Sequence, residues 1–252
     1  MKTITFIGNG NMAFSIAEGL KERYTLEVVG RDLQNLIKFE DKLGIKIKKS
    51  LLENFDMSGK TVILCIKPSN IEEVSHKLNG EAKIIYSVLA GTPIEKIREL
   101  LQPNAIVRTM PNLAASVKKS MTTLCGDEEF RDEAIEIFGA IGATLWVGSQ
   151  KELDIATALA GSGPAYLALI AEALADGAVK QGMKRDDAMS VMRGLFEGFG
   201  ALIQNTHPAL LKDGVMSAGG TTAAGYSALE DKGVRSAFID AIERAYKRAK
   251  EL

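Results

Sequence analysis

A short run of glycines and hydroxylated residues near the end of the chain has the composition of an anion-binding turn. The run is Ser217-Ala-Gly-Gly-Thr-Thr222, and the next residues, Ala223 to Glu230, have the pattern of a helix. Two adjacent glycines remove the Cβ atoms that would keep a ligand off the backbone. A turn at a helix N-terminus presents unpaired N–H groups and the positive end of the helix dipole to an anion. We therefore predict that Ser217, Gly219, Gly220 and Thr221 bind an anionic group.

A second glycine motif, near the N-terminus, fits the pattern G-x-G-x-x-A. Gly8-Asn-Gly-Asn-Met-Ala13 follows the apolar run Thr3–Ile7 and opens a helical pattern. In this fingerprint the first glycine makes a tight turn, the second admits a pyrophosphate, and the last small residue lets helix and strand approach closely. The motif predicts a dinucleotide site at Gly8, Gly10, Asn11, Met12 and Ala13. Because the cofactor phosphates are assigned here, the anion at Ser217–Thr222 is expected to be a substrate carboxylate.

The choice of nicotinamide coenzyme depends on the end of the second expected strand, which runs into Gly30-Arg-Asp32. An acidic residue there usually holds the ribose 2′-hydroxyl of NAD, whereas a nearby arginine accommodates the 2′-phosphate of NADP. Arg31 comes first and its guanidinium can hold a phosphate with two hydrogen bonds, while Asp32 has the place of a helix cap. This favours NADPH, with NADH as the alternative and a solvated Arg31 as the competing interpretation.

The pattern of the chain changes near Gly148. Residues 1–148 alternate short apolar runs with helical segments, which predicts a parallel sheet covered by helices on both faces. We expect strands at Thr3–Ile7, Leu26–Val29, Thr61–Ile66, Lys83–Val88, Ala105–Met110, Ser120–Cys125 and Thr144–Val147. Helices are expected between them at Asn11–Arg23, Asp32–Leu43, Asn70–Leu78, Thr92–Leu101 and Glu128–Ile141. Residues 149–252 predict a second, all-α domain with helices over Ile155–Lys180, Arg185–Gln204 and Gly233–Lys250.

Two further segments fall at the carboxyl edge of the expected sheet, where parallel sheets bind their ligands. Lys67-Pro68 closes one strand, and Ser87–Gly91 ends the next with small residues that let the backbone pass under a nicotinamide. Each is an ordinary loop taken alone. Their shared position predicts that both lie beside the dinucleotide.

The long stretch Ile155–Val179 is apolar on most faces, although Pro164, Glu172 and Asp176 interrupt it. Such a helix needs burial on most faces, which a small helical domain supplies poorly by itself. We infer a homodimer that shares these helices, and a soluble helix in preference to a membrane span. Lys and Arg total 31 against 32 Asp and Glu, so charge gives no argument for nucleic acid or an anionic membrane as a partner. Cytoplasmic localisation is the default expectation.

The inventory of acid–base groups is short. His76 is expected on a solvated helix and His207 in a turn or capping role, and no Ser/His/Asp set or metal cluster emerges. Cys65 and Cys125 are expected to be reduced, partly buried thiols. Alcohol oxidation needs a base on the hydroxyl, whereas a cyclic imine is basic enough to arrive protonated. The protein must then place the imine carbon about 3–3.5 Å from C4 of the nicotinamide, anchor the carboxylate, and offer the nitrogen a partner such as Thr222.

Seven segments resemble the pyrroline-5-carboxylate reductase family, in the correct order along essentially the whole chain. They are FIGNGNMA (Phe6–Ala13), IKP (Ile66–Pro68), AGT (Ala90–Thr92), RTMPN (Arg108–Asn112), GSGPAY (Gly161–Tyr166), HPALLKDGV (His207–Val215) and SAGGTT (Ser217–Thr222). The last two together are very specific. The resemblance implies NAD(P)H-dependent reduction of 1-pyrroline-5-carboxylate to L-proline by a Rossmann domain followed by a helical dimerisation domain. It also implies an active site between the domains, a substrate loop supplied across the dimer, and frequent assembly of dimers into decamers.

The resemblance also assigns roles by position. Thr222 is implied to bond the substrate nitrogen, with a first-turn helix residue bonding its own backbone as the alternative. Ser217, Gly219, Gly220 and Thr221 are implied to line the carboxylate pocket. The cofactor contacts implied at the sheet edge are Cys65, Ile66, Lys67, Pro68, Val88, Leu89 and Ala90. The GSGPAY segment is interpreted as mainly structural, because Pro164 blocks one backbone hydrogen bond and kinks the helix.

The chain departs from the family pattern at several positions. The family usually has Pro at Ala218, Thr-Pro at Leu113-Ala114, Ser at Ala160 and a branched aliphatic residue at Tyr226. A missing proline leaves the loop with more states to lose on binding. No departure removes a hydrogen-bonding side chain that the site needs, so they affect affinity and substrate range more than the reaction.

Three other functions compete. A reductase of a related cyclic imino acid, such as a six-membered ring, uses the same groups. A β-hydroxyacid dehydrogenase carries a catalytic lysine on the long helix after the Rossmann domain, and Ile155–Val179 has none. A non-catalytic NADP-binding sensor needs the cofactor site but has no use for a Gly-Gly-Thr-Thr anion loop.

Overall fold

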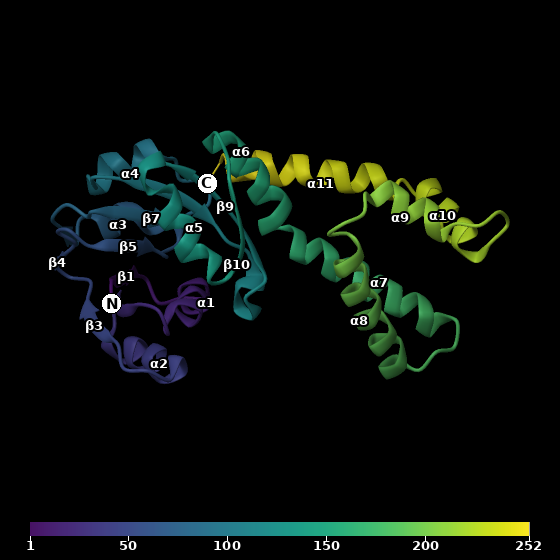
Figure 1. The fold of residues 1–252 in the computed structure, drawn as a ribbon, viewed down its shortest axis with the longest axis horizontal. Helices are drawn as coiled ribbons and strands as arrows, with labels where there is room; N and C mark the ends of the chain where they lie inside the picture. The colour runs from purple at the N-terminus through teal and green to yellow at the C-terminus, as the bar shows by residue number, and fades with distance from the viewer. Residues whose placement is uncertain (252) are drawn as a thin grey trace. The chain divides into compact units, whose positions relative to one another are not determined.

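The computed structural model describes residues 1–251, which form two compact units. The first contains Met1–Ser162 together with residues 244–251, and the second contains Gly163–Glu243 (Figure 1). The first unit is an α/β structure and the second is helical. This is the predicted fold class, a Rossmann-type domain followed by an all-α region.

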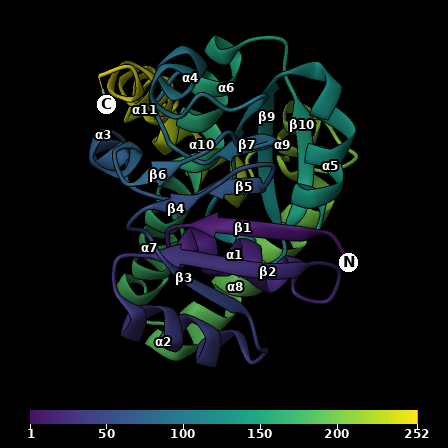
Figure 2. The ribbon, with the colours of Figure 1, turned by 90° about the vertical axis from the view of Figure 1, so that its left-hand side faces the viewer.

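One eight-stranded sheet organises the first unit within the described residues. Its order is β10-β9-β8-β7-β5-β1-β2-β3, and β4 pairs with β6 in a separate two-stranded ribbon (Figure 2). The strands are β1 (Thr3–Ile7), β2 (Thr25–Gly30), β3 (Lys48–Leu51), β4 (Phe55–Asp56), β5 (Thr61–Leu64), β6 (Leu78–Asn79), β7 (Ile84–Ser87), β8 (Ile106–Met110), β9 (Ser120–Gly126) and β10 (Gly142–Trp146).

Helices cover both faces of this sheet, as the near-continuous apolar strands predict. Neighbouring residues of β5 show it: Ile63 packs in the cluster formed with α1 and α2, whereas Val62 and Leu64 pack against α3 and α4. The helices of this unit are α1 (Asn11–Leu20), α2 (Leu33–Leu43), η1 (Pro68–Asn70), α3 (Ile71–Ser75), α4 (Ile94–Leu101), η2 (Leu113–Val117), η3 (Glu128–Phe130), α5 (Arg131–Gly139) and α6 (Gln150–Ala156).

The expectation of a wholly parallel sheet is wrong at one junction. β9 pairs antiparallel with β8, while β10 pairs parallel with β9. A parallel crossover needs a dozen or more residues and usually a helix. The connection from Met110 to Ser120 holds only the short 3₁₀ segment η2, so the chain turns back beside β8 instead of crossing over.

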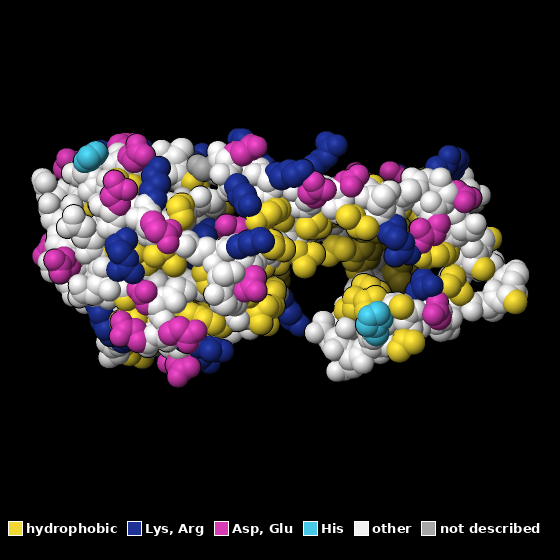
Figure 3. All heavy atoms as spheres, turned by 90° about the horizontal axis from the view of Figure 1, so that it is seen from above, with side chains coloured by type: hydrophobic (Ala, Val, Ile, Leu, Met, Phe, Trp, Pro, Cys, Tyr) yellow, Lys and Arg dark blue, Asp and Glu magenta, His cyan; other side chains and the backbone are white. Residues whose placement is uncertain are grey.

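The second half is helical throughout its described residues. After α6 come a π-helical turn, η4 (Thr157–Gly161), and then α7 (Gly163–Lys180), α8 (Arg185–Leu202), α9 (Pro208–Val215), α10 (Thr221–Asp231) and α11 (Val234–Ala249). The first helices expose much of their apolar surface within one chain: Leu169 is 64% exposed and Val191 is 61% exposed. Figure 3 shows hydrophobic side chains gathered on this helical part. By length and composition alone, the helical run Gln150–Lys180 is also apolar enough to cross a membrane.

The π-helical turn has a local cause. Pro164 lacks the N–H that would bond the carbonyl of Ala160 four residues earlier, so that carbonyl needs another donor. The side-chain amide of Asn112 donates to it at 3.1 Å, and Ser162 N bonds Thr157 O at 3.2 Å in the wider π pattern. The Asn of RTMPN and the Pro of GSGPAY are therefore parts of one structural feature.

Candidate functional site

The turn Gly8–Ala13 has the geometry that a pyrophosphate needs. Gly8 has φ +107°, and a Cβ there would lie 2.4 Å from the carbonyl oxygen of Cys65, so only glycine fits. Gly10 has no atom within 4 Å of a Cβ position, so its outer side is open. Ala13 is fully buried in the core beneath the turn. The two glycines and the alanine thus play the three steric roles of the fingerprint.

The N-terminus of α1 has free donors at this turn. The first helical bond runs from Phe14 N to Gly10 O at 3.0 Å, and Gly10 offers no side-chain cap. The amides of Asn11, Met12 and Ala13 therefore have no intrahelical acceptor. Uncapped amides at a helix N-terminus, reached past an open glycine, fit a dinucleotide phosphate.

A cavity of about 210 Å³ adjoins this turn. β1 and β5 are neighbours in the sheet although a long segment separates them in sequence, so their carboxyl ends form the switch-point crevice where such folds bind ligands. Six predicted cofactor residues line the cavity: Gly8, Gly10, Arg31, Cys65, Ile66 and Lys67. The structure therefore brings residues from three separate loops to one place.

The other predicted cofactor residues lie at the same edge but do not line this cavity. Pro68 begins η1, and Val88, Leu89 and Ala90 follow β7. Leu89 is fully buried in the core, backbone included, so it presents no surface to a ligand in the single chain. Val88 N bonds Leu64 O at 3.1 Å, which ties the end of β7 to the end of β5.

The side chains of Arg31 and Asp32 make different contacts and so have different roles. Asp32 caps α2, since its carboxylate accepts the Asn35 amide at 2.9 Å, as predicted. Arg31 lines the cavity, and its Nη1 lies 3.7 Å from the Glu73 carboxylate of α3. Both side chains of this pair are half exposed, so the interaction is weak and salt-sensitive.

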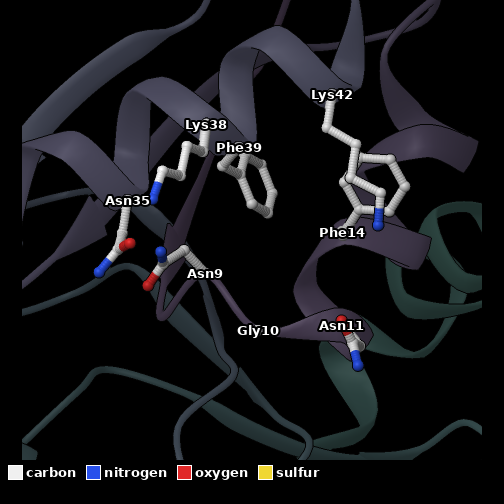
Figure 4. A pocket seen from close by; sticks show the side chains of 8 residues that line it. All are labelled: Asn9, Gly10, Asn11, Phe14, Asn35, Lys38, Phe39 and Lys42. Atoms are coloured by element: carbon white, nitrogen blue, oxygen red, sulfur yellow. The ribbon is translucent and has the colours of Figure 1, made fainter.

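A second cavity, of about 330 Å³, lies on the other side of the glycine turn. Figure 4 shows its lining side chains from α1, α2 and the turn between β1 and α1. Asn9 and Gly10 line both cavities. The residue pattern did not indicate this second cavity, although Asn35, Lys38 and Lys42 recur at the i, i+3 and i+7 spacing that places polar residues on one helix face.

The two cysteines are free thiols, as predicted. Burial raises the pKa of the Cys65 thiol well above its ordinary value. Burial also raises the pKa of Cys125 to about 11. Both thiols are therefore protonated near neutral pH and are poor nucleophiles. Among residues 1–251 there is no group of three or more His, Cys, Asp or Glu arranged to hold a metal.

The segment Ser217–Gly220 forms a tight turn in the helical unit. Gly220 N donates to Ser217 O at 3.0 Å, and Gly219 has φ +70°. A positive φ at the third position is typical of a type II turn, which needs glycine there. A Cβ on Gly220 would contact the Ser217 hydroxyl too closely, so a side chain there would displace the Ser217 side chain from the turn.

This turn presents the N-terminus of α10. The first helical bond is from Ala224 N to Gly220 O at 3.2 Å, and Gly220 provides no side-chain cap. The amides of Thr221, Thr222 and Ala223 are therefore without intrahelical acceptors. Ser217, Thr221 and Thr222 are exposed in the single chain. The five predicted substrate residues thus lie within one turn, which has the donors to hold a carboxylate.

The histidines behave as predicted. His76 is exposed at the end of α3, and His207 caps α9 by accepting the Ala209 amide on Nδ1 at 3.2 Å. Neither lies among the residues that line the two cavities described above.

Comparisons with known proteins agree with this geometry. Residues 150–252 match the family model described as pyrroline-5-carboxylate reductase dimerisation, and residues 3–91 match the one described as NADP oxidoreductase coenzyme F420-dependent. The chain is 34% identical to a pyrroline-5-carboxylate reductase of Methanosarcina acetivorans, covering 99% of this chain and 97% of the relative.

Solved structures give the same result. The 1-pyrroline-5-carboxylate reductase of Streptococcus pyogenes has a TM-score of 0.88 and 29% identity, covering 99% of this chain and 98% of the other. A Plasmodium falciparum pyrroline carboxylate reductase with NADP bound shares the fold, with a TM-score of 0.80 and 23% identity over 99% of this chain and 97% of the other.

A Rossmann sheet with an uncapped glycine turn at its switch point is a dinucleotide-binding fold, and the match of residues 3–91 to an NADP oxidoreductase model places the chain among the oxidoreductases. The 34% identity with the Methanosarcina acetivorans relative, over nearly the whole length of both chains, then identifies the family. The chain belongs to the pyrroline-5-carboxylate reductase family.

Proposed function

We propose that this protein reduces 1-pyrroline-5-carboxylate to L-proline with NAD(P)H, the last step of proline biosynthesis. The observation that carries the proposal is the turn Ser217–Gly220 in front of the uncapped start of α10. A carboxylate on a small ring matches its donors in charge and size. Family membership supports the same substrate.

The residues of the chain divide the work. Ser217 and the amides near Gly219, Gly220 and Thr221 hold the substrate carboxylate. The substrate nitrogen is protonated, and its N–H donates to the Thr222 hydroxyl, which keeps the ring oriented while the nitrogen becomes an amine. The bound nicotinamide supplies the hydride, and the Gly8–Ala13 turn and the Cys65–Pro68 loop hold the coenzyme. No side chain has to remove a proton from carbon.

The preferred coenzyme is NADPH, with NADH as the less favoured alternative. The support comes from Arg31, which lines the coenzyme cavity, and from Asp32, whose carboxylate is used in capping α2. An arginine in this position accommodates a 2′-phosphate. Arg31→Ala is expected to weaken NADPH binding while sparing NADH, and equal losses for both would remove the assignment.

The working protein is a homodimer in the cytoplasm. Its functional domains are residues 1–148 and 149–252, a division that differs from the two compact units because it assigns residues 149–162 and 244–251 to the helical domain. The dimer is supported by the exposed apolar side chains of α7 and α8 and by the match to a dimerisation family model. A partner helix can cover this surface as well as a lipid bilayer can, so dimer formation also accounts for the apolar run Gln150–Lys180. Further assembly into decamers is proposed from the family alone.

The test is oxidation of NADPH, followed at 340 nm, with purified protein and pyrroline-5-carboxylate. Turnover with this substrate supports the proposal. Faster turnover with a six-membered cyclic imino acid would favour the related reductase, and NADPH binding without turnover of either would favour a sensor. Analytical ultracentrifugation at micromolar concentration tests the dimer, which a monomer would contradict.

A further inference from the structure

The end of β2 lacks the side chain that usually contacts the coenzyme ribose. Folds of this type that bind NAD place an acidic residue there, and this chain has Gly30. A Cβ on Gly30 would lie 2.9 Å from Leu36 Cδ2 and 3.2 Å from Asn9 Oδ1. Leu36 and the Asn9 amide therefore occupy the space that a side chain at Gly30 would need, and the Asn9 amide is the polar group beside this position.

The first turns of α2 supply positive charge beside Asn9. Asn35, Lys38 and Lys42 line the 330 Å³ cavity together with Asn9. Figure 4 shows the Lys38 ammonium extending toward Asn9 and Asn35. Within residues 1–251, no carboxylate oxygen lies within 4.0 Å of the Lys38 ammonium. The cavity also has no acidic lining residue that could neutralise this charge.

Lys42 lines the same cavity but has another partner. Its Nζ lies 3.9 Å from the centroid of the Phe14 ring, in a cation–π contact. In Figure 4 it extends over that ring, on the far side of Phe39 from Asn9. Lys42 thus carries the same charge on the same helix but extends over Phe14 and not toward Asn9, which makes it a matched control for Lys38.

Arg31 is the other residue that could bind the 2′-phosphate, and it lies near a carboxylate. Arg31 lines the neighbouring cavity and lies 3.7 Å from Glu73, which also lies 3.4 Å from Lys77 Nζ. Both side chains of the Arg31–Glu73 pair are half exposed, so this contact is weak and leaves Arg31 able to bind a phosphate. Lys38 adds a second positive charge beside Asn9, in a cavity that no acidic residue lines.

We propose that Lys38, with the amides of Asn9 and Asn35, binds the 2′-phosphate of NADPH and determines the preference for NADPH over NADH. The phosphate monoester enters the 330 Å³ cavity, while the adenosine lies in the 210 Å³ cavity on the other side of Asn9. Arg31, which lines the neighbouring cavity, contacts the same phosphate from the side of the adenosine, so Arg31 and Lys38 share the 2′-phosphate. This inference rests on the proposed NAD(P)H-dependent function and deepens it.

The experiment measures coenzyme binding to the purified full-length protein by fluorescence titration, without imine substrate. Lys38→Met is expected to weaken NADPH binding by about tenfold to hundredfold, since it removes a charge-assisted contact, and to leave NADH binding unchanged. Lys42→Met removes the same charge from the far side of the cavity and is expected to weaken NADPH binding much less than Lys38→Met does, with NADH binding unchanged. Lys38→Arg is expected to restore much of the NADPH affinity, and the loss with Lys38→Met is expected to shrink at high salt.

Several results would overturn the inference. They are an unchanged NADPH affinity in Lys38→Met, an equal loss of NADPH and NADH, or an equal effect of Lys42→Met. Lys38 and Lys42 are both exposed, so the variants are expected to fold, and circular dichroism checks this. Because the titration involves no turnover, a protein that binds NADPH through Lys38 but does not reduce pyrroline-5-carboxylate would contradict the proposed reaction and leave this site standing.

Discussion

Breaking the buried ion pair of Arg108 and Asp154 is expected to destabilise the protein strongly. Arg108 is the largest fully buried side chain of the chain, with 1% of its surface exposed. Its Nη2 donates to Asp154 Oδ1 at 2.8 Å and its Nη1 to Gln150 Oε1 at 3.3 Å. Both acceptors belong to α6, so these hydrogen bonds hold α6 against the middle of β8.

The magnitude follows from the burial of the two partners. Removing one partner of a buried pair costs about 3–5 kcal/mol, because the remaining charge has no compensation. The Asp154 side chain keeps 18% exposure, so water screens its half of the pair, and we expect a loss at the lower end, about 3 kcal/mol, for Asp154→Leu. In Arg108→Met with Asp154→Leu no charge remains buried, and most of the stability is expected to return. Arg108 Nε already lacks a hydrogen-bond partner, which removes part of the benefit of the native pair.

Urea unfolding of the four proteins in this double-mutant cycle measures the interaction. All four are compared at one protein concentration, because the stability of an oligomer depends on concentration. A loss below about 1 kcal/mol in Asp154→Leu would refute the reasoning, since it would mean that solvent already screens the pair. A double variant less stable than Asp154→Leu would also refute it, because packing and not charge would then dominate.

Three further predictions concern the substrate turn and the pH dependence of stability. Thr222→Ala is expected to lower kcat and kcat/KM together, by about tenfold or more, with NADPH affinity nearly unchanged in the same preparation; unchanged turnover would exclude Thr222 from the reaction. Ala218→Pro restores the residue that favours the second position of a type II turn, and we expect about 0.4–1 kcal/mol of added stability, read as a higher Tm, together with a lower KM for the imine. For Glu27, burial raises the pKa but hydrogen bonds from Lys48, Lys60, Thr5 and Ser50 outweigh it, so its pKa lies below the ordinary value. The ionised Glu27 carboxylate therefore stabilises the folded protein above about pH 4.3, and this stabilisation is lost as pH falls through the lower folded pKa. Glu27→Gln is expected to flatten the acid side of the curve of Tm against pH. An unchanged curve would contradict this expectation.

Local features of this protein were determined by the sequence itself. The expected strand Thr3–Ile7 has the bounds of β1, and Asp32 and His207 cap helices as their positions predict. The turn at Gly8 and the turn at Gly219 both use the positive φ that only glycine adopts easily. These features depend on backbone sterics and hydrogen bonds within a few residues, which is why the residue types are sufficient to predict them.

The tertiary structure alone decided which distant residues meet. Asn112 donates to the carbonyl that Pro164 leaves unbonded, and Arg108 finds its carboxylate on α6, more than forty positions along the chain in each case. The direction of β9 beside β8, and the meeting of Asn9, Gly30 and α2 around a second cavity, were likewise not evident from the pattern of residues. Periodicity tells which face of a helix or strand is buried, but the partner of a buried polar group depends on how whole elements pack. The positions of the motifs could therefore be predicted from the sequence, whereas the contacts that hold the motifs in place could be identified only in the folded structure.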